Sequence, residues 1–499
     1  MRFAWPVLGS RLLTFLALAA LGCSLAVFAA RCFAVCQAGC IAPGTTQTSG
    51  CEEESFFAVW RDVHGDPVYR AAADPPYASA YFNWAFYAFY GTILRPAVGL
   101  FGDSRLPLLG HCLTGLLGCV GAFGGAWAGS RLHKDAPRRL AGAAVGAYLF
   151  LGPLVGWWAV TLRPDVPALL LEAIGLGTFL CWHRDHPWRA TTVAWLAFYA
   201  AWSFKPTSVG GLVAAALFLL VRRRWRELAV LGGGSVVLWG MTLAIGGPAY
   251  RTSLLETATN NTFSLNVGAA NLLAAARALA PVVVGLPWWL HALRSRPPLR
   301  RRSPTRDALL LAGIGTLVVT AAFFVAGSKT GAGQNYFFAP GLLLTVGTVS
   351  GMWRLERTWA APALACALIV LLQGGLLSGA WGTLSLRANA GQLAQRWTTF
   401  RQLPEPRFSD DLRLNLPWLN SHSPPLVLAY NYPADRARGR PFASGGVGGM
   451  VGRGELAALY LFNPTAGWYD GAPLDRYDRG ETVAGLTVYR HRSTAEPHQ

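Results

Sequence analysis

Long apolar runs separated by short polar gaps fill most of the chain between residues 7 and 381. Each run approaches the length of about 20 residues that an α-helix needs to cross a bilayer. We expect spans near residues 7–30, 106–128, 140–160, 167–182, 190–204, 209–221, 227–247, 276–293, 307–327, 336–353 and 359–381. The pattern predicts an all-α polytopic membrane domain over residues 1–381, with about 11 transmembrane helices.

One stretch of this pattern leaves two interpretations open. Residues 190–221 lie between two basic gaps and are fewer than the about 40 residues that two full crossings need. They form either one long helix or two short ones. A single crossing would move the basic gap at 222–226 to the other side of the membrane, so the charge pattern favours two short helices.

The last part of the chain has a different character. Residues 382–499 are polar and rich in Pro and Gly, with short β-like runs at 426–430, 458–462 and 486–489 after a helical stretch at 384–402. This pattern predicts a small soluble α/β domain at the C-terminus.

The net charge of +18 first suggests a nucleic-acid partner, but the positive residues are not gathered in one patch. They fill short gaps at 131–139, 183–189, 222–226, 294–306 and 354–357, which all fall on one side if the spans alternate. The opposite short gaps hold only Arg163, Lys205 and Lys329. The positive-inside rule therefore predicts an inside N-terminus, with loops 31–105 and 248–275 and the C-terminal domain outside, and no nucleic acid.

Four of the nine cysteines cluster after the first apolar run, at Cys32, Cys36, Cys40 and Cys51. They form no C-x-x-C pair, which disfavours zinc. One or two disulfides are expected if this loop faces an oxidising space, with the connectivity left open.

An acidic run, Glu52–Glu54, opens the polar part of the first outside loop and precedes the amphipathic segment "SFFAVW". We expect Phe56, Phe57 and Trp60 to hold a short helix on the membrane surface. The carboxylates would then lie at the boundary of water and lipid, where one can act as general base on an acceptor hydroxyl. The simpler alternative is a solvated acidic patch.

Several short motifs follow one another in a recognisable order. They are the acids Glu53 and Glu54, "GDPVY" at 65–69, "DPPY" at 74–77, "LRPD" at 162–165, "FKPT" at 204–207 and "SKTGAGQNYFF" at 328–338. This order resembles the membrane-embedded GT-C glycosyltransferases. The resemblance is to the bacterial branch similar to dolichyl-phosphate-mannose–protein mannosyltransferases and lipid A aminoarabinose transferases. The first acid of that family is usually Asp, where Glu53 stands here, and Glu52 and Glu54 offer alternative registers.

The resemblance implies an inverting transfer of a sugar from a polyprenyl phosphate to a hydroxyl acceptor, at the outer face of a bacterial inner membrane. The acceptor, a glycan, lipid or protein, stays open. The implied catalytic acids are Glu53, Glu54 and Glu52. A departing lipid phosphate needs cationic partners, for which the outside cations Arg163, Lys205 and Lys329 are the candidates. The alternative is that these cations are snorkelling anchors.

Further residues of the same motifs are expected to bind substrate: Asp165, Tyr69, Tyr77, Gln334, Asn335 and Tyr336. No cofactor is expected besides the lipid-linked sugar, and the outside carboxylates leave a divalent metal open.

Two other classes compete with the glycosyltransferase. A transporter or lipid flippase usually carries functional charges near the bilayer midplane. Here only Glu172 and His111 lie within apolar runs; we expect Glu172 to line a lipid groove or pair with an Arg, and His111 to be a satisfied core residue. A non-catalytic scaffold whose C-terminal domain binds a partner is the second alternative.

Overall fold

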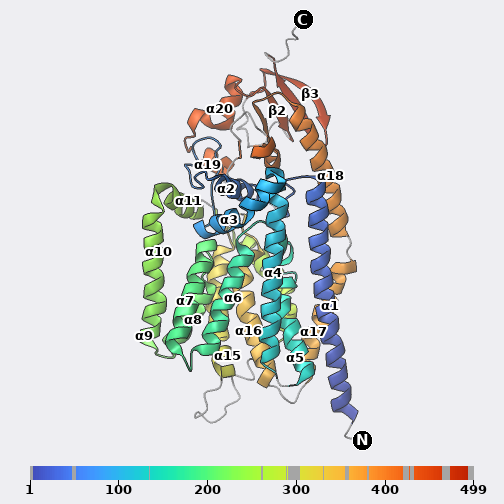
Figure 1. Ribbon diagram of the computed structural model, residues 1–499, viewed down its shortest axis with the longest axis vertical. Helices are drawn as coiled ribbons and strands as arrows, with labels where there is room; N and C mark the ends of the chain where they lie inside the picture. The colour runs from blue at the N-terminus through green and yellow to red at the C-terminus, as the bar shows by residue number, and fades with distance from the viewer. Residues whose placement is uncertain are drawn as a thin grey trace.

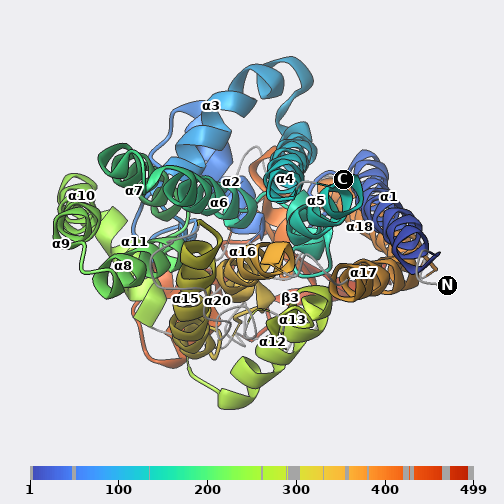
Figure 2. The same ribbon diagram turned by 90° about the horizontal axis from the view of Figure 1, so that it is seen from below.

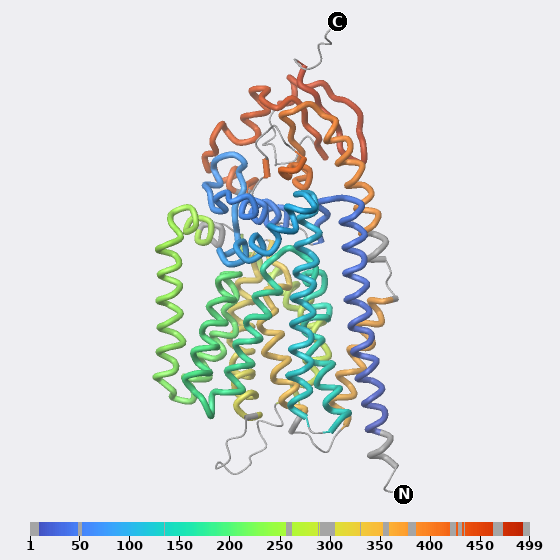
Figure 3. The backbone as a smooth tube through the Cα atoms, viewed as in Figure 1, coloured from blue at the N-terminus to red at the C-terminus, as the bar shows by residue number. Residues whose placement is uncertain are grey.

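The computed structural model describes residues 4–47, 52–133, 135–259, 262–287, 289, 304–329, 331–354, 359–378, 381–419, 426–427, 432–462 and 473–492. A bundle of helices carries the C-terminal domain at one end, called here the domain end (Figure 1). The first helix begins at the opposite end of the bundle, called here the far end (Figure 3).

The bundle is built from helices that run along its long axis. They are α1 (Ala4–Ile41), α4 (Leu106–Arg131), α5 (Ala136–Leu151), α6 (Asp165–Trp182), α7 (Pro187–Phe204), α8 (Gly210–Val221), α9 (Trp225–Leu228), α10 (Gly234–Ile245), α12 (Leu265–Ala278), α13 (Ala280–Val283), α15 (Pro304–Ala326), α16 (Phe338–Arg354) and α17 (Ala360–Ser378). Seen along the bundle, α6 and α16 lie near its middle, whereas α1 and α17 lie side by side at one edge (Figure 2).

Six helices of the described residues are long and apolar enough to cross a membrane: Gly9–Ile41, Asp103–Arg131, Asp165–Trp182, Trp225–Ile245, Thr305–Ala326 and Ala360–Leu377. The predicted fold class, a polytopic all-α domain with a small C-terminal α/β domain, is confirmed, and the count of about 11 spans stays a prediction. Residues 190–221 form two helices, α7 and α8, which meet at the Lys205–Val209 loop. The two-helix interpretation of that stretch is therefore the one that the structure adopts.

Close packing between α4 and α5 depends on four glycines. A Cβ atom on Gly129 would lie 2.1 Å from the carbonyl oxygen of Gly142, and one on Gly146 would lie 2.0 Å from that of Gly125. The four positions form a G-x-x-x-G pair on each helix, the pattern that lets two apolar helices bring their backbones together.

The first loop differs from the expectation. Helix α1 continues to Ile41, and the loop itself contains α2 (Glu52–His64) and α3 (Trp84–Phe101), which lie over the domain end of the bundle (Figure 1). The prediction that Phe56 and Phe57 rest on the membrane surface is wrong. Both rings are buried in a protein core shared with α3, because α3 covers the apolar face of α2.

The C-terminal domain follows α18 (Trp381–Gln402) and contains a four-stranded sheet in the order β1-β2-β4-β3. The strands are β1 (Arg407–Ser409), β2 (Ala458–Leu461), β3 (Tyr477–Val483) and β4 (Leu486–His491), with β1 parallel to β2 and the other pairs antiparallel. The short helices α19 (Tyr432–Ala437) and α20 (Gly446–Arg453) lie beside it, and α11 (Gly247–Thr259) lies at the domain end of the bundle.

Two apolar contacts attach this domain to the bundle. Ala38 and Ala42 at the end of α1 share a core with Leu393 and Phe400 of α18. Tyr77 of the first loop is fully buried among residues of the C-terminal domain. These contacts hold the first loop between the bundle and the domain, which is where the predicted chemistry lies.

Candidate functional site

Asp165 is the centre of a polar cluster at the domain end. It begins α6, and its fully buried carboxylate accepts hydrogen bonds from groups in three separate parts of the chain. Lys205 Nζ lies 2.5 Å from Oδ1, Asn335 Nδ2 lies 2.7 Å from Oδ1, and Arg163 Nε lies 3.3 Å from Oδ2. The motifs "LRPD", "FKPT" and "QNY" therefore meet at one carboxylate.

Aromatic rings surround the two cations of this Asp165 cluster. Arg163 lies 4.5 Å from the ring centre of Trp158 and 5.4 Å from that of Phe82, and Lys205 lies 5.3 Å from that of Tyr336. Both cationic side chains are 10% exposed. The Asp165 cluster thus brings two little-exposed cations together, where a bound anion can contact them.

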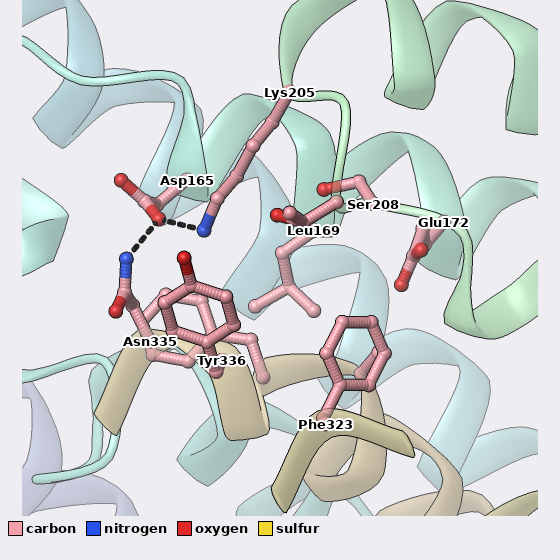
Figure 4. Close-up of a pocket in the computed structure, with 11 residues that line it drawn as sticks. Asp165, Leu169, Glu172, Lys205, Ser208, Phe323, Asn335 and Tyr336 are labelled. Carbon is pink, nitrogen blue, oxygen red and sulfur yellow. Dashed lines mark hydrogen bonds and ion pairs between the residues drawn. The ribbon is translucent and has the colours of Figure 1, made fainter. Parts of the chain in front are cut away.

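A pocket extends from this cluster into the bundle (Figure 4). It encloses about 300 Å³ of empty space, part of it open to solvent. Its polar lining comes from Asp165, Glu172, Lys205, Thr207, Ser208, Asn335 and Tyr336, and its apolar lining from Leu169, Phe323, Phe338 and Ala339. Sequence reasoning noted Thr207 only as part of "FKPT" and missed Ser208 and Phe323, because neither carries a charge that would distinguish it.

Glu172 lies about two helical turns beyond Asp165 on α6, and it lines the same pocket. It is 2% exposed, and its carboxylate accepts hydrogen bonds from the backbone N–H groups of Gly210 and Gly211 at the start of α8. From the sequence, Glu172 is expected to pair with an Arg or to line a lipid groove. Within the described residues no Arg pairs with it, and it lines the pocket. It thus serves at least as a cap for α8.

Glu52 joins the acidic helix to the cation cluster. Its buried carboxylate accepts hydrogen bonds from His111 Nε2 at 2.8 Å, from Leu162 N at 3.1 Å and from Gln47 N at 2.7 Å. His111 is therefore the satisfied core residue that the sequence predicts. Because Leu162 precedes Arg163, Glu52 positions the backbone from which that guanidinium extends.

Glu53 faces the C-terminal domain, and its side chain is partly exposed. Loss of water around it raises the pKa of its carboxyl to about 7; the charge of Glu52 adds to the rise, and Arg413 of the C-terminal domain opposes it. A carboxyl that titrates near neutral pH is suited to accept a proton from a reacting hydroxyl. Glu54, the third member, is buried on the same first turn of α2.

The other predicted residues lie apart from the cluster. Lys329, in the loop after α15, lies 5.9 Å from the ring of Phe263. Gln334 donates hydrogen bonds to the backbone carbonyls of Pro153 and Leu154. The Tyr69 hydroxyl donates a hydrogen bond to Phe82 O. No described contact joins Lys329 to Asp165.

Tyr77 also lies apart, since its hydroxyl donates to Ala443 O of the C-terminal domain at 2.7 Å. This hydrogen bond joins the first loop to that domain, and substrate binding by Tyr77 stays a prediction.

The cysteines and acids of the described residues show no metal centre. Cys32, Cys36 and Cys40 are free thiols on α1, and Cys51 lies outside the described residues. Within the part of the chain that the structure describes, no three side chains of His, Cys, Asp or Glu are grouped to hold a metal ion.

This fold is GT-C-like, as the order of the motifs predicts. The particular structures that it resembles are those of ArnT from Cupriavidus metallidurans. The form bound to undecaprenyl phosphate aligns with a TM-score of 0.58 at 16% identity, and the apo form with 0.60 at 15%. Each alignment covers 95% of this chain and 99% of the other. No family model matches the chain, and no curated protein sequence matches it.

Proposed function

We propose that this protein transfers a sugar from a polyprenyl phosphate to a hydroxyl acceptor, with the donor phosphate bound at the Asp165 cluster. The observation that supports this most strongly is the meeting of Arg163 and Lys205 at one buried carboxylate beside a pocket. The likeness of the fold to a protein that binds undecaprenyl phosphate adds support.

The charge of the cluster suits the departure of a lipid phosphate. A sugar-linked polyprenyl phosphate carries one negative charge, and the free lipid phosphate gains a second as the sugar leaves. Cations that face the developing charge stabilise the transition state more than the ground state. The side chains of Arg163 and Lys205 are each 10% exposed, so water screens their charges little.

The acceptor step needs a base, for which we propose Glu53. The acceptor oxygen attacks the anomeric carbon, the bond from that carbon to the phosphate oxygen breaks, and its electron pair stays on the phosphate. The proton of the hydroxyl passes to the Glu53 carboxylate. Attack opposite the leaving phosphate inverts the anomeric centre. Glu54 is the next candidate for this base, and Glu52 acts through position because three hydrogen bonds occupy its carboxylate.

The proposed location is a bacterial inner membrane, with the domain end outside. The basic gaps of the sequence lie at the far end, where α4 ends at Arg131 and α8 ends beside Arg222, whereas Arg163 and Lys205 lie at the domain end. The positive-inside rule assigns the far end to the cytoplasm. A sugar acceptor outside the cytoplasm, either glycan, lipid or protein, would then reach α2 between the bundle and the C-terminal domain.

A transporter or flippase fits the arrangement less well. Such proteins place their functional charges near the midplane and build the site between two repeated halves. In the described residues the Asp165 cluster lies at the start of α6, at the domain end of the bundle. A scaffold would have no use for two desolvated cations beside an open pocket.

Consumption of the donor by the purified protein tests this function. Undecaprenyl phosphate linked to a labelled sugar is incubated in detergent with the protein and with a membrane extract as acceptor source, and released undecaprenyl phosphate is measured. We expect release by the wild type and little by Glu53→Gln. Equal release from both, or none from either with a range of sugars, contradicts the proposal.

A further inference from the structure

Two buried oxygen atoms on residues that line the pocket have no hydrogen-bond partner among the described residues. They are Oε1 of Glu172 and Oδ1 of Asn335. Both residues line the pocket, and they are 2% and 6% exposed. A buried acceptor that is left without a donor destabilises the folded protein. Native proteins rarely retain such groups without a reason, so these two call for a ligand that donates hydrogen bonds.

The partners of the remaining atoms show which way each group faces. One side of the Glu172 carboxylate is occupied by the N–H groups of Gly210 and Gly211. The amide nitrogen of Asn335 is occupied by Asp165 at 2.7 Å. The atoms left without a partner in the described part of the chain, Glu172 Oε1 and Asn335 Oδ1, are therefore both hydrogen-bond acceptors. Figure 4 shows Glu172 and Asn335 on opposite sides of the pocket, with Lys205 nearer to Asn335.

The pocket thus has a cationic end and an acceptor end. Lys205 and Arg163 suit an anion, and Glu172 suits hydroxyl groups about two helical turns away along α6. A sugar phosphate has this order of groups: a charged phosphate next to a ring with several O–H donors. The seven residues from Asp165 to Glu172 rise about 10 Å along α6, which is close to the length of one phosphate joined to one sugar ring.

We propose that Glu172 and Asn335 form the subsite for the sugar ring of the donor, and that this subsite takes a single monosaccharide. The inference rests on the proposed function, because the phosphate beside Lys205 fixes the position of the ring. Glu172 accepts a hydrogen bond from a ring hydroxyl and so determines which sugars bind well. The N–H groups of α8 hold its carboxylate in place, which makes the discrimination rigid.

The test measures sugar preference separately from phosphate binding. Dissociation constants of the purified full chain are measured for undecaprenyl phosphate and for the same lipid linked to glucose, mannose, arabinose or the disaccharide maltose. For Glu172→Gln we expect the preference among the three monosaccharide lipids to fall about tenfold or more, because the amide presents a donor or a weaker acceptor. Binding of undecaprenyl phosphate without sugar should change less than threefold. The maltose lipid should bind at least tenfold more weakly than the glucose lipid in the wild type.

A second variant and a matched control keep the test decisive. Ser208→Leu, which fills part of the same pocket, should weaken the sugar lipids and spare the bare lipid phosphate. Asp307→Asn changes another buried acid at the far end, where Asp307 is bound by His183, Arg184 and Arg222. It should lower the melting temperature without changing sugar preference.

Three results would overturn the inference in distinguishable ways. If the bare lipid phosphate binds but Glu172→Gln and Ser208→Leu leave every sugar preference unchanged, Glu172 is only a cap for α8. If the maltose lipid binds as well as the glucose lipid, the subsite is not limited to one sugar. If no undecaprenyl lipid binds the wild type, the proposed function fails and the sugar subsite fails with it.

Discussion

Replacing Lys205 by Met removes the cation that lies closest to Asp165 while keeping a side chain of similar length. A charge-assisted hydrogen bond contributes about 1.5–3 kcal/mol, and each 1.4 kcal/mol corresponds to about tenfold in affinity. We therefore expect Lys205→Met to weaken binding of undecaprenyl phosphate by about 10- to 100-fold. The ammonium is 10% exposed, so water will replace little of the lost interaction.

The fold should survive this change, since Asp165 keeps its contacts with Arg163 and Asn335. The assay is equilibrium binding of labelled undecaprenyl phosphate in detergent, together with the melting temperature of the ligand-free protein. Lys205→Arg should retain most of the affinity because the charge remains. Lys329→Met makes the same change at a lysine of the loop after α15 that lies 5.9 Å from the ring of Phe263, and its effect should be smaller.

One outcome would refute this reasoning. If Lys205→Met binds the lipid phosphate as tightly as the wild type, the Asp165 cluster does not hold the phosphate. Arg163 and Lys205 would then be snorkelling anchors near the membrane surface.

Three further predictions concern the acidic helix and the topology. Glu53→Gln should reduce transfer by about 10²–10⁴-fold with donor binding retained. The ionised carboxylate is the base and its pKa is about 7, so the wild-type transfer rate should rise as the pH increases through 7 and fall as the pH decreases. A transfer rate that is flat from pH 6 to 8 would speak against Glu53. Glu52→Gln should lower both the melting temperature and the affinity for the donor, because it disturbs the bond to Leu162 N beside Arg163, whereas an effect on the transfer step alone would show that Glu52 is itself the base. A reporter that is active only outside the cytoplasm, fused after Gln499, should be active; a stable but silent fusion would mean that the domain end faces the cytoplasm.

The cluster could be predicted from the sequence because its members have local signals. Arg163, Asp165 and Lys205 are charges at the ends of apolar runs, and alternation of the spans brings such ends to one side of the membrane. Charge and order along the chain were enough to group them with Asn335. The distances to Asp165 then show that these residues also share one carboxylate.

Other roles could not be predicted, because they depend on contacts between distant parts of the chain. Glu52 looks like its two neighbours in the sequence, and its contacts with His111 and Leu162, 59 and 110 residues away, distinguish it. Tyr77 belongs to a motif that suggested substrate, yet its partner Ala443 is 366 residues away. The sequence around Phe56 and Phe57 predicts an apolar helix face, but such a face can pack against lipid or against protein. Here it packs against α3.

The position of the lipid phosphate is the most direct test of the account. A structure of the purified full chain with undecaprenyl phosphate, determined in a lipid nanodisc, would locate the phosphate group by its density. We predict that it lies within hydrogen-bonding distance of Lys205 or Arg163, at the mouth of the pocket that Glu172 lines. Density for the phosphate at any other site, with the Asp165 cluster unchanged and empty, would contradict the central claim.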